Sequence, residues 1–127
     1  IGHNHDMSSF APEVHLTASI WNWGKIYQDV VQNVSVGHWK SENIWWGLKE
    51  GLVDIAPFGK MVPAKLREKV LRKKKEIISN KFSVFSGPLV DQEGTIRITK
   101  EKHATDEELL NMNWFLKGII DNTNPKN

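Results

Sequence analysis

Hydrophobic and polar positions alternate over the stretch LTASIW, residues 16–21. A period of two places the apolar side chains on one face and predicts a β-strand. From Gly24 onward the apolar positions recur every three or four residues, which predicts an amphipathic helix that closes near Gly37. The chain therefore changes from strand to helix within a few residues.

The same alternation of elements continues towards the middle of the chain. Residues 43–48 alternate as a strand would, and residues 52–57 form a short apolar run that stops at Pro57. Pro63 stands where a helix favours proline, and the residues after it have a helical apolar period. The order strand, helix, strand, helix predicts an α/β architecture with crossover connections.

The second half is less regular. Two short strands around the Asp-Gln-Glu-Gly sequence of residues 91–94 predict a β-hairpin. Thr105 followed by Glu108 is a capping box, which predicts a helix that continues towards Ile120. Residues 121–127 are polar, and we expect a disordered tail there. Residues 1–127 are expected to form a single unit.

Composition limits the partners of the chain. Its formal charge of +2 does not require nucleic acid or an anionic membrane. No apolar run approaches the roughly 18 residues of a membrane span, so we expect no direct insertion into a membrane. The basic run at residues 72–76 lies around a predicted helix without aromatic neighbours, which favours a solvated face over nucleic-acid binding.

One group of side chains raises the possibility of catalysis. His3 and His5 stand two residues apart, and Asp6 follows. Metal-dependent hydrolases use such histidine pairs, but a catalytic metal needs three or more protein ligands, and the other histidines have no ligand spacing. The alternative is a polar loop over the strand ends. No phosphate loop and no serine-nucleophile motif is present, so we expect no enzyme, no metal and no cofactor.

The tryptophans are the unusual feature, with six in 127 residues. Trp21 and Trp23 stand at the carboxyl end of the first predicted strand, and ligands of open α/β sheets bind outside the carboxyl ends of strands. An indole offers a flat apolar surface, and Asn22 between them offers both a donor and an acceptor. The alternative is that Trp23 packs beneath the start of the following helix.

Several stretches, taken in order, resemble one family. The most specific are GLKEG…APFG…VP, FSGPLVDQEG and ELLNMNWF, accompanied by HNHDMSSFAP and LTASIWNWGKIYQDVV. In this order they resemble the carboxyl-terminal part of the basic membrane protein (BMP) family of bacterial substrate-binding lipoproteins. The resemblance covers nearly all of the chain.

The resemblance implies part of a type I periplasmic-binding-protein fold, mostly the second lobe. That fold has a mainly parallel sheet flanked by helices, here with a β-hairpin and a carboxyl-terminal helix. It also implies the solute-binding component of an ABC importer, located in the bacterial cell envelope and acting with a transporter permease. The chain corresponds to about the last third of such a lipoprotein, so we expect it to be a fragment.

The resemblance also points to site residues. In nucleoside-binding members an aspartate falls on Asn4, a second acid on Asp6, and a lysine on Trp21, and the acid and the lysine hold the sugar hydroxyls. Here an amide and an indole replace the first acid and the lysine. The resemblance, read with this change, implies a purine-type ligand and favours a free nucleobase such as adenine, held by Asn4, Asp6, Trp21, Asn22 and Trp23.

Two other functions stay open from the sequence. One is a metal-dependent hydrolase that uses His3, His5 and Asp6, and the other is a protein-interaction fragment without a small-molecule ligand. We expect the chain by itself to bind its ligand weakly or not at all. We also expect it to self-associate through exposed sheet edges and apolar helix faces.

Overall fold

The structure is a computed structural model that describes residues 1–120. The chain divides into two compact units, residues 1–82 and residues 83–127. The expectation that the whole chain forms a single unit stays a prediction.

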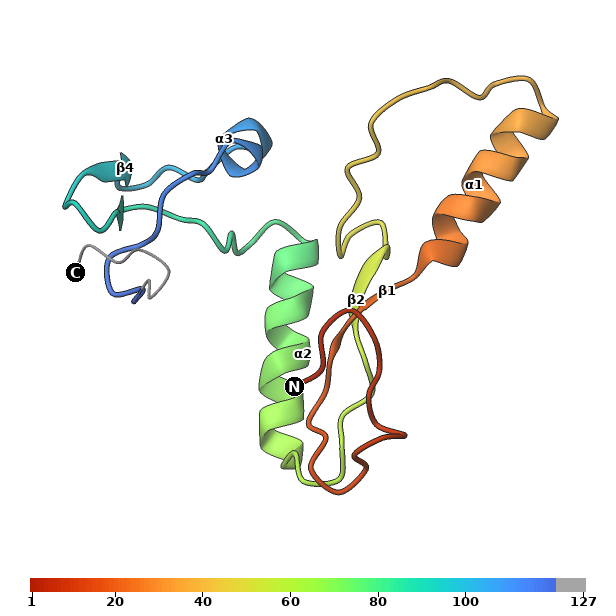
Figure 1. Cartoon of the computed structure of the whole chain (residues 1–127), viewed down its shortest axis with the longest axis horizontal. Helices are drawn as coiled ribbons and strands as arrows, with labels where there is room; N and C mark the ends of the chain where they lie inside the picture. The colour runs from red at the N-terminus through yellow and green to blue at the C-terminus, as the bar shows by residue number, and fades with distance from the viewer. Residues whose placement is uncertain (121–127) are drawn as a thin grey trace. The chain divides into compact units, whose positions relative to one another are not determined.

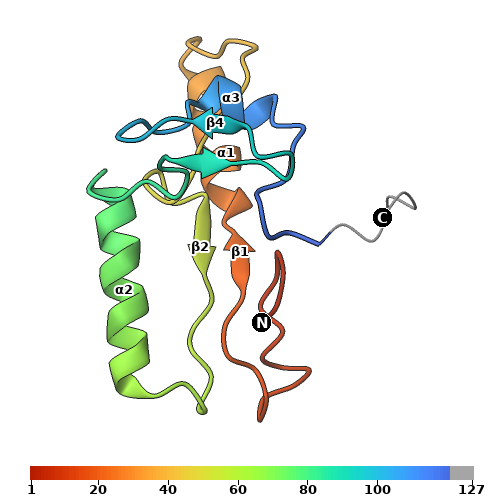
Figure 2. The ribbon, with the colours of Figure 1, turned by 90° about the vertical axis from the view of Figure 1, so that its left-hand side faces the viewer.

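Two short strands form the centre of the first unit. Strand β1 (Ser19–Trp21) pairs antiparallel with β2 (Val53–Ile55), in a register that places Ile20 opposite Asp54. The two strands run side by side in both views (Figures 1 and 2). Gly2 adds one parallel bridge to Ala18, directly before β1. The amino-terminal segment therefore lies along the start of β1.

The α/β class is confirmed, but the direction of the strands differs from the expectation of a mainly parallel sheet. Both two-stranded sheets of residues 1–120 are antiparallel, and the parallel contact in this part of the chain is the bridge at Gly2. The reason is the place to which the connection between β1 and β2 brings the chain back. Trp21 ends β1 and pairs with Val53, which begins β2, so the chain comes back to the end of β1 and not to its start.

Helix α1 (Trp23–Ser35) follows β1 after one residue, as the apolar period predicted. The strand expected at residues 43–48 is absent, and a turn at residues 48–51 takes its place near β2. Glu50 closes this turn by accepting the backbone N–H of Gly47 at 2.8 Å. Trp45, within this stretch, is 57% exposed. Within residues 1–82 the alternating stretch has no neighbouring strand to pair with, which is why its pattern was misleading.

Helix α2 (Ala64–Ile78) begins after Pro63, as expected. It lies beside β2 in both views, and Lys74 forms an ion pair with Asp54 of that strand (Figures 1 and 2). Lys73 pairs with Glu76 at 2.5 Å and lies 4.0 Å from the centre of the Phe82 ring. Part of the basic run therefore stabilises the first unit itself.

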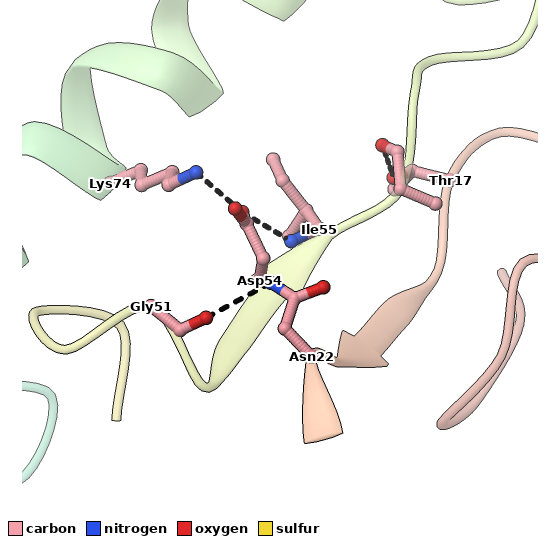
Figure 3. A network of polar contacts seen from close by, with 7 residues as sticks. Thr17, Asn22, Gly51, Asp54, Ile55 and Lys74 are labelled. Carbon is pink, nitrogen blue, oxygen red and sulfur yellow. Dashed lines mark hydrogen bonds and ion pairs between the residues drawn. The ribbon is translucent and has the colours of Figure 1, made fainter. Parts of the chain in front are cut away.

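The core of the first unit is small. Its buried apolar side chains are Ala18, Leu52, Ala56 and Val62. The hydroxyl of Thr17 donates to the carbonyl of Ala56 at 2.7 Å, which ties the start of β1 to the end of β2 (Figure 3). Many large apolar side chains are exposed, including Val31 and Val34 of α1. No helix among the described residues has both the length and the apolar character needed to cross a membrane.

The hairpin predicted for the second unit is confirmed. Strand β3 (Leu89–Val90) pairs antiparallel with β4 (Ile96–Ile98). Asp91 at the turn is fully buried, and its carboxylate accepts from the backbone N–H of Thr95 at 2.7 Å and from Nε of Arg97 at 2.6 Å. The Asp91 carboxylate thus accepts hydrogen bonds both from the turn and from the neighbouring strand β4.

Helix α3 (Asp106–Leu110) begins with the predicted capping box, in which Thr105 and Glu108 bond each other's backbone N–H groups. The prediction that this helix continues towards Ile120 is wrong. After Leu110 the chain turns back to the hairpin, where Leu116 bridges Asp91 and the N–H of Lys117 donates to Val90 at 2.9 Å. Pairing with the hairpin replaces the helical hydrogen bonds. The expected tail at 121–127 lies outside the described residues.

Candidate functional site

The candidate site lies in the first unit, where β1 becomes α1. Trp21 is the last residue of β1, Asn22 precedes α1, and Trp23 is the first residue of α1. The two indoles are therefore separated by one residue that belongs to neither element. This local change of backbone directs both rings to the same place.

Trp21 and Trp23 stack on each other. Their ring centres are 5.4 Å apart and their planes differ by 14°. Trp21 and Trp23 are 40% and 50% exposed as residues, so neither lies in a dry interior and Trp23 is not packed beneath the helix. A flat ligand inserted between them would need about 7 Å, twice an ordinary contact distance. The stacked pair, called the platform below, therefore offers one outer face of each ring, on opposite sides of the stack.

Asn4 approaches the edge of this platform. Its side-chain Oδ1 accepts the indole N–H of Trp21 at 2.8 Å. Its backbone adopts a left-handed conformation, with φ of 63°, which asparagine tolerates better than most residues. Its backbone N–H donates to the hydroxyl of Ser19 at 3.3 Å. The structure thus brings together two of the residues that the sequence analysis selected, 17 positions apart.

Asn22 forms hydrogen bonds that hold the backbone of the first unit together. Its backbone N–H donates to the carbonyl of Leu52 at 2.7 Å, and its side-chain Nδ2 donates to the carbonyl of Gly51 at 2.9 Å (Figure 3). Gly51 has φ of 76°, a left-handed conformation that favours glycine. The amide does not cap α1. Asn22 therefore anchors the junction to the following turn, and we assign it a positioning role.

Asp6 stands two residues after Asn4, and one of its carboxylate oxygens already accepts a hydrogen bond. Its Oδ1 accepts the backbone N–H of Ser8 at 2.9 Å and lies 3.4 Å from Nε2 of His15. The hydrogen bond from Ser8 lowers the pKa of the Asp6 carboxyl, and His15 and His5 lower it further. Asp6 is therefore an acceptor over the whole neutral range.

The hydrolase alternative receives no support from the geometry. Residues 1–120 contain no group of three or more histidine, aspartate or glutamate side chains arranged to hold a metal ion. Asp6 faces His15, which is buried, while His3 and His5 are exposed. A His-x-His spacing without a third converging ligand does not make a catalytic metal centre.

Ser19 and Gly51 also contribute to this site, although neither was expected there. Ser19 shares the strand face of Trp21, so the alternation that predicted β1 carried a signal for it. Gly51 stands within KEGLV, and its left-handed backbone could not be inferred from spacing alone. Together the arrangement offers a stacking surface with polar groups at its edge.

Comparisons with known proteins agree with this chemistry. Residues 1–86 match the model of the Bmp family, described as ABC transporter substrate-binding proteins, PnrA-like. Members of this family are described by substrate binding and not by catalysis. This confirms the expected class of protein, a substrate-binding component and not an enzyme. The match includes β1, α1 and the whole candidate site.

A curated relative and a solved structure add to this result. The chain is 40% identical over 120 residues to a purine-binding protein of Brucella abortus (strain 2308), an overlap of 94% of this chain and 34% of the relative. It thus spans about a third of that protein's length. A crystal structure described as a transcriptional activator of the comK gene from Bacillus halodurans superimposes on 65% of this chain and 29% of its own, with a TM-score of 0.59 and 22% identity.

That structural likeness concerns the fold alone, and it supports the α/β class. The family model covers more than half of the chain, and the alignment with the relative extends over nearly all of it. The chain therefore belongs to the Bmp family of PnrA-like substrate-binding proteins of ABC transporters.

Proposed function

We propose that this chain contributes the purine-facing part of a solute-binding protein that serves an ABC importer. Family membership supports the transport role, and the relative described as a purine-binding protein supports the ligand class. The single observation that carries the proposal is the exposed Trp21–Trp23 platform with Asn4 at its edge. Stacking on an aromatic side chain contributes about 1 to 3 kcal/mol per base.

Within the purines we propose a free nucleobase such as adenine over a nucleoside. In the BMP resemblance the sugar is held by an aspartate at position 4 and a lysine at position 21. Here those positions carry an amide and an indole that bond each other at 2.8 Å. Charge-assisted hydrogen bonds to the ribose hydroxyls are replaced by a flat surface, so a nucleoside gains little affinity from its sugar.

The complete protein would act in the cell envelope and pass its ligand to a transporter permease. In a two-lobed receptor the ligand favours the closed state by contacting both lobes. This chain supplies one side of such contacts, so its own affinity is weak. We also propose that the chain self-associates, because large apolar side chains such as Tyr27 and Val31 of α1 are 63% and 69% exposed.

Reconstruction of the sugar grip tests the preference for a nucleobase. The double variant Asn4→Asp with Trp21→Lys restores both groups of the nucleoside-binding pattern. We expect adenosine to gain and adenine to lose affinity, each measured by ligand-observed NMR at millimolar concentration. The matched control is Asn80→Asp with Trp39→Lys, which makes the same changes at exposed positions outside the site. A nucleoside preference in the unmodified chain would contradict the proposal.

A further inference from the structure

The hydrogen bond between Trp21 and Asn4 fixes which way the Asn4 amide points. The two ends of an asparagine amide are usually assigned from their surroundings. An indole N–H can only donate, so the atom of Asn4 that lies 2.8 Å from it must be the oxygen. The Nδ2 group, with its two N–H bonds, therefore points away from the indole nitrogen.

Asn4 is also held through its backbone. Its N–H donates to Ser19 Oγ, in the same strand as Trp21, and its left-handed φ of 63° limits how it can rotate. Ser19 and Trp21, the two hydrogen-bond partners of Asn4, both lie in β1. The Asn4 amide is therefore held in a fixed position relative to the Trp21 ring. Donors held in place before a ligand arrives lose little freedom on binding.

The other polar residues at the site are partly engaged. Nδ2 of Asn22 donates to the carbonyl of Gly51, and Oδ1 of Asp6 accepts the backbone N–H of Ser8. No hydrogen bond among residues 1–120 occupies Nδ2 of Asn4. Asn4 is exposed, so a ligand on the platform can reach this group.

We infer that Asn4 is a specificity-determining donor, oriented by the indole N–H of Trp21, which selects flat ligands that present an acceptor to it. The inference rests on the proposed function and deepens it. The accepted class is a heteroaromatic ring with an unprotonated ring nitrogen or a carbonyl oxygen at the edge near Trp21. Trp21 then has two separable roles, because its face stacks on the ligand and its N–H orients Asn4.

Substitution can separate these two roles. Trp21→Phe keeps an aromatic face and removes the N–H, which frees the amide to turn its oxygen outward. Asn4→Asp keeps an acceptor for the indole but has no donor. The matched control is Asn80→Asp, because Asn80 is another exposed asparagine with a positive φ, 56°, outside the site.

The probes are adenine and its 3-deaza and 7-deaza analogues, each lacking one ring-nitrogen acceptor. We expect one analogue to bind at least about tenfold more weakly than adenine, and we expect Trp21→Phe to reduce this ratio to about threefold or less. Asn4→Asp should weaken adenine about tenfold, and Asn80→Asp should leave it unchanged. A ratio that Trp21→Phe leaves unchanged, or an unmodified chain that binds both analogues as well as adenine, overturns the inference alone.

The free chain gives a second readout. The Trp21 indole N–H resonance should move upfield and exchange faster in Asn4→Ala, because its acceptor is lost. An indole resonance that does not respond overturns the orientation of Asn4 independently of any ligand. Failure of the unmodified chain to bind adenine at millimolar concentration overturns the proposed function and this inference with it.

Discussion

The indole rings of Trp21 and Trp23 lie face to face, 5.4 Å between centres, although one belongs to a strand and the other to a helix. Asn22 between them is bonded to Gly51 and Leu52, so the backbone that separates the rings is fixed. The platform is thus a property of the junction, and its parts can be removed one at a time.

Removal of the Trp21 ring tests the stacking role of the platform. We expect Trp21→Ala to weaken adenine binding by about 5- to 150-fold, which corresponds to 1 to 3 kcal/mol of base stacking. Trp39→Ala is the matched control, because Trp39 is similarly exposed, at 52%, and lies outside the site. Ligand-observed NMR titration measures both, and an equal loss in the two variants would argue against a specific platform.

Removal of the Asn22 amide tests its positioning role. Asn22→Ala leaves the Gly51 carbonyl without its side-chain donor, and a lost hydrogen bond of this kind costs about 0.5 to 1.5 kcal/mol. We expect the turn at residues 48–51 to exchange its amide hydrogens faster, while the far end of α2 is unchanged. Hydrogen-exchange mass spectrometry would measure this, and uniform behaviour along the first unit would refute the assignment.

The ion pair between Lys74 and Asp54 makes the stability of the first unit depend on pH (Figure 3). Burial raises the pKa of Asp54, but hydrogen bonds from Lys74 and the N–H of Ile55 outweigh it and hold the pKa below 3.8. A lowered pKa means that the contribution is complete above the unfolded value near 3.8 and is lost as pH falls through the folded value.

We therefore expect Lys74→Met to lower the free energy of unfolding by about 1 kcal/mol at pH 7, and the difference from the unmodified chain to shrink as the pH falls through the lowered pKa of Asp54. Lys65→Met is the control, since Lys65 is an exposed lysine of the same helix. Urea denaturation at several pH values measures the difference. A Lys74→Met effect that persists unchanged at low pH would contradict the role of this pair.

Arg97 protects a buried charge in the second unit. Burial raises the pKa of the Asp91 carboxyl, and the hydrogen bonds from Arg97 and Thr95 lower it to a net value below its usual range. Arg97→Met should therefore destabilise the hairpin more than Lys100→Met, a change at an exposed neighbour. Backbone chemical shifts of β3 and β4 report this, and equal effects of the two variants would show that the pair contributes nothing specific.

Self-association is the last expectation to test. Light scattering at increasing concentration should show masses above the 14.6 kDa of one chain. Val31→Lys with Val34→Lys places charges on the exposed face of α1, at positions 69% and 58% exposed, and should reduce the association. A monomeric mass at all concentrations would end this proposal.

Local signals predicted the elements that depend on local physics. Helix α2 begins after Pro63, the hairpin turns at Asp91, and the Thr105 capping box opens α3. Each is encoded by residues that contact each other within a few positions. What failed depends on distant partners, since the alternating stretch around Trp45 found no strand to pair with, and the chain after Leu110 paired with the hairpin instead of extending a helix.

The candidate site divides in the same way. Trp21, Trp23 and Asn4 were selected from a strand period and a family resemblance, and the structure brings these three together. The roles of Ser19 and Gly51 were not anticipated, because each acts on a residue that is remote in sequence. A hydrogen bond across 29 positions leaves no periodic trace for a pattern to reveal.

Because the two indoles stand on either side of Asn22, they form an intrinsic spectroscopic probe of this junction. Closely stacked indoles couple their electronic transitions, so their near-ultraviolet circular dichroism depends on the angle between the rings. Any swing of α1 against the strand pair would change that angle and the spectrum with it. A motion at this junction can thus be followed without attaching a dye, in the same two side chains that we propose as the ligand surface.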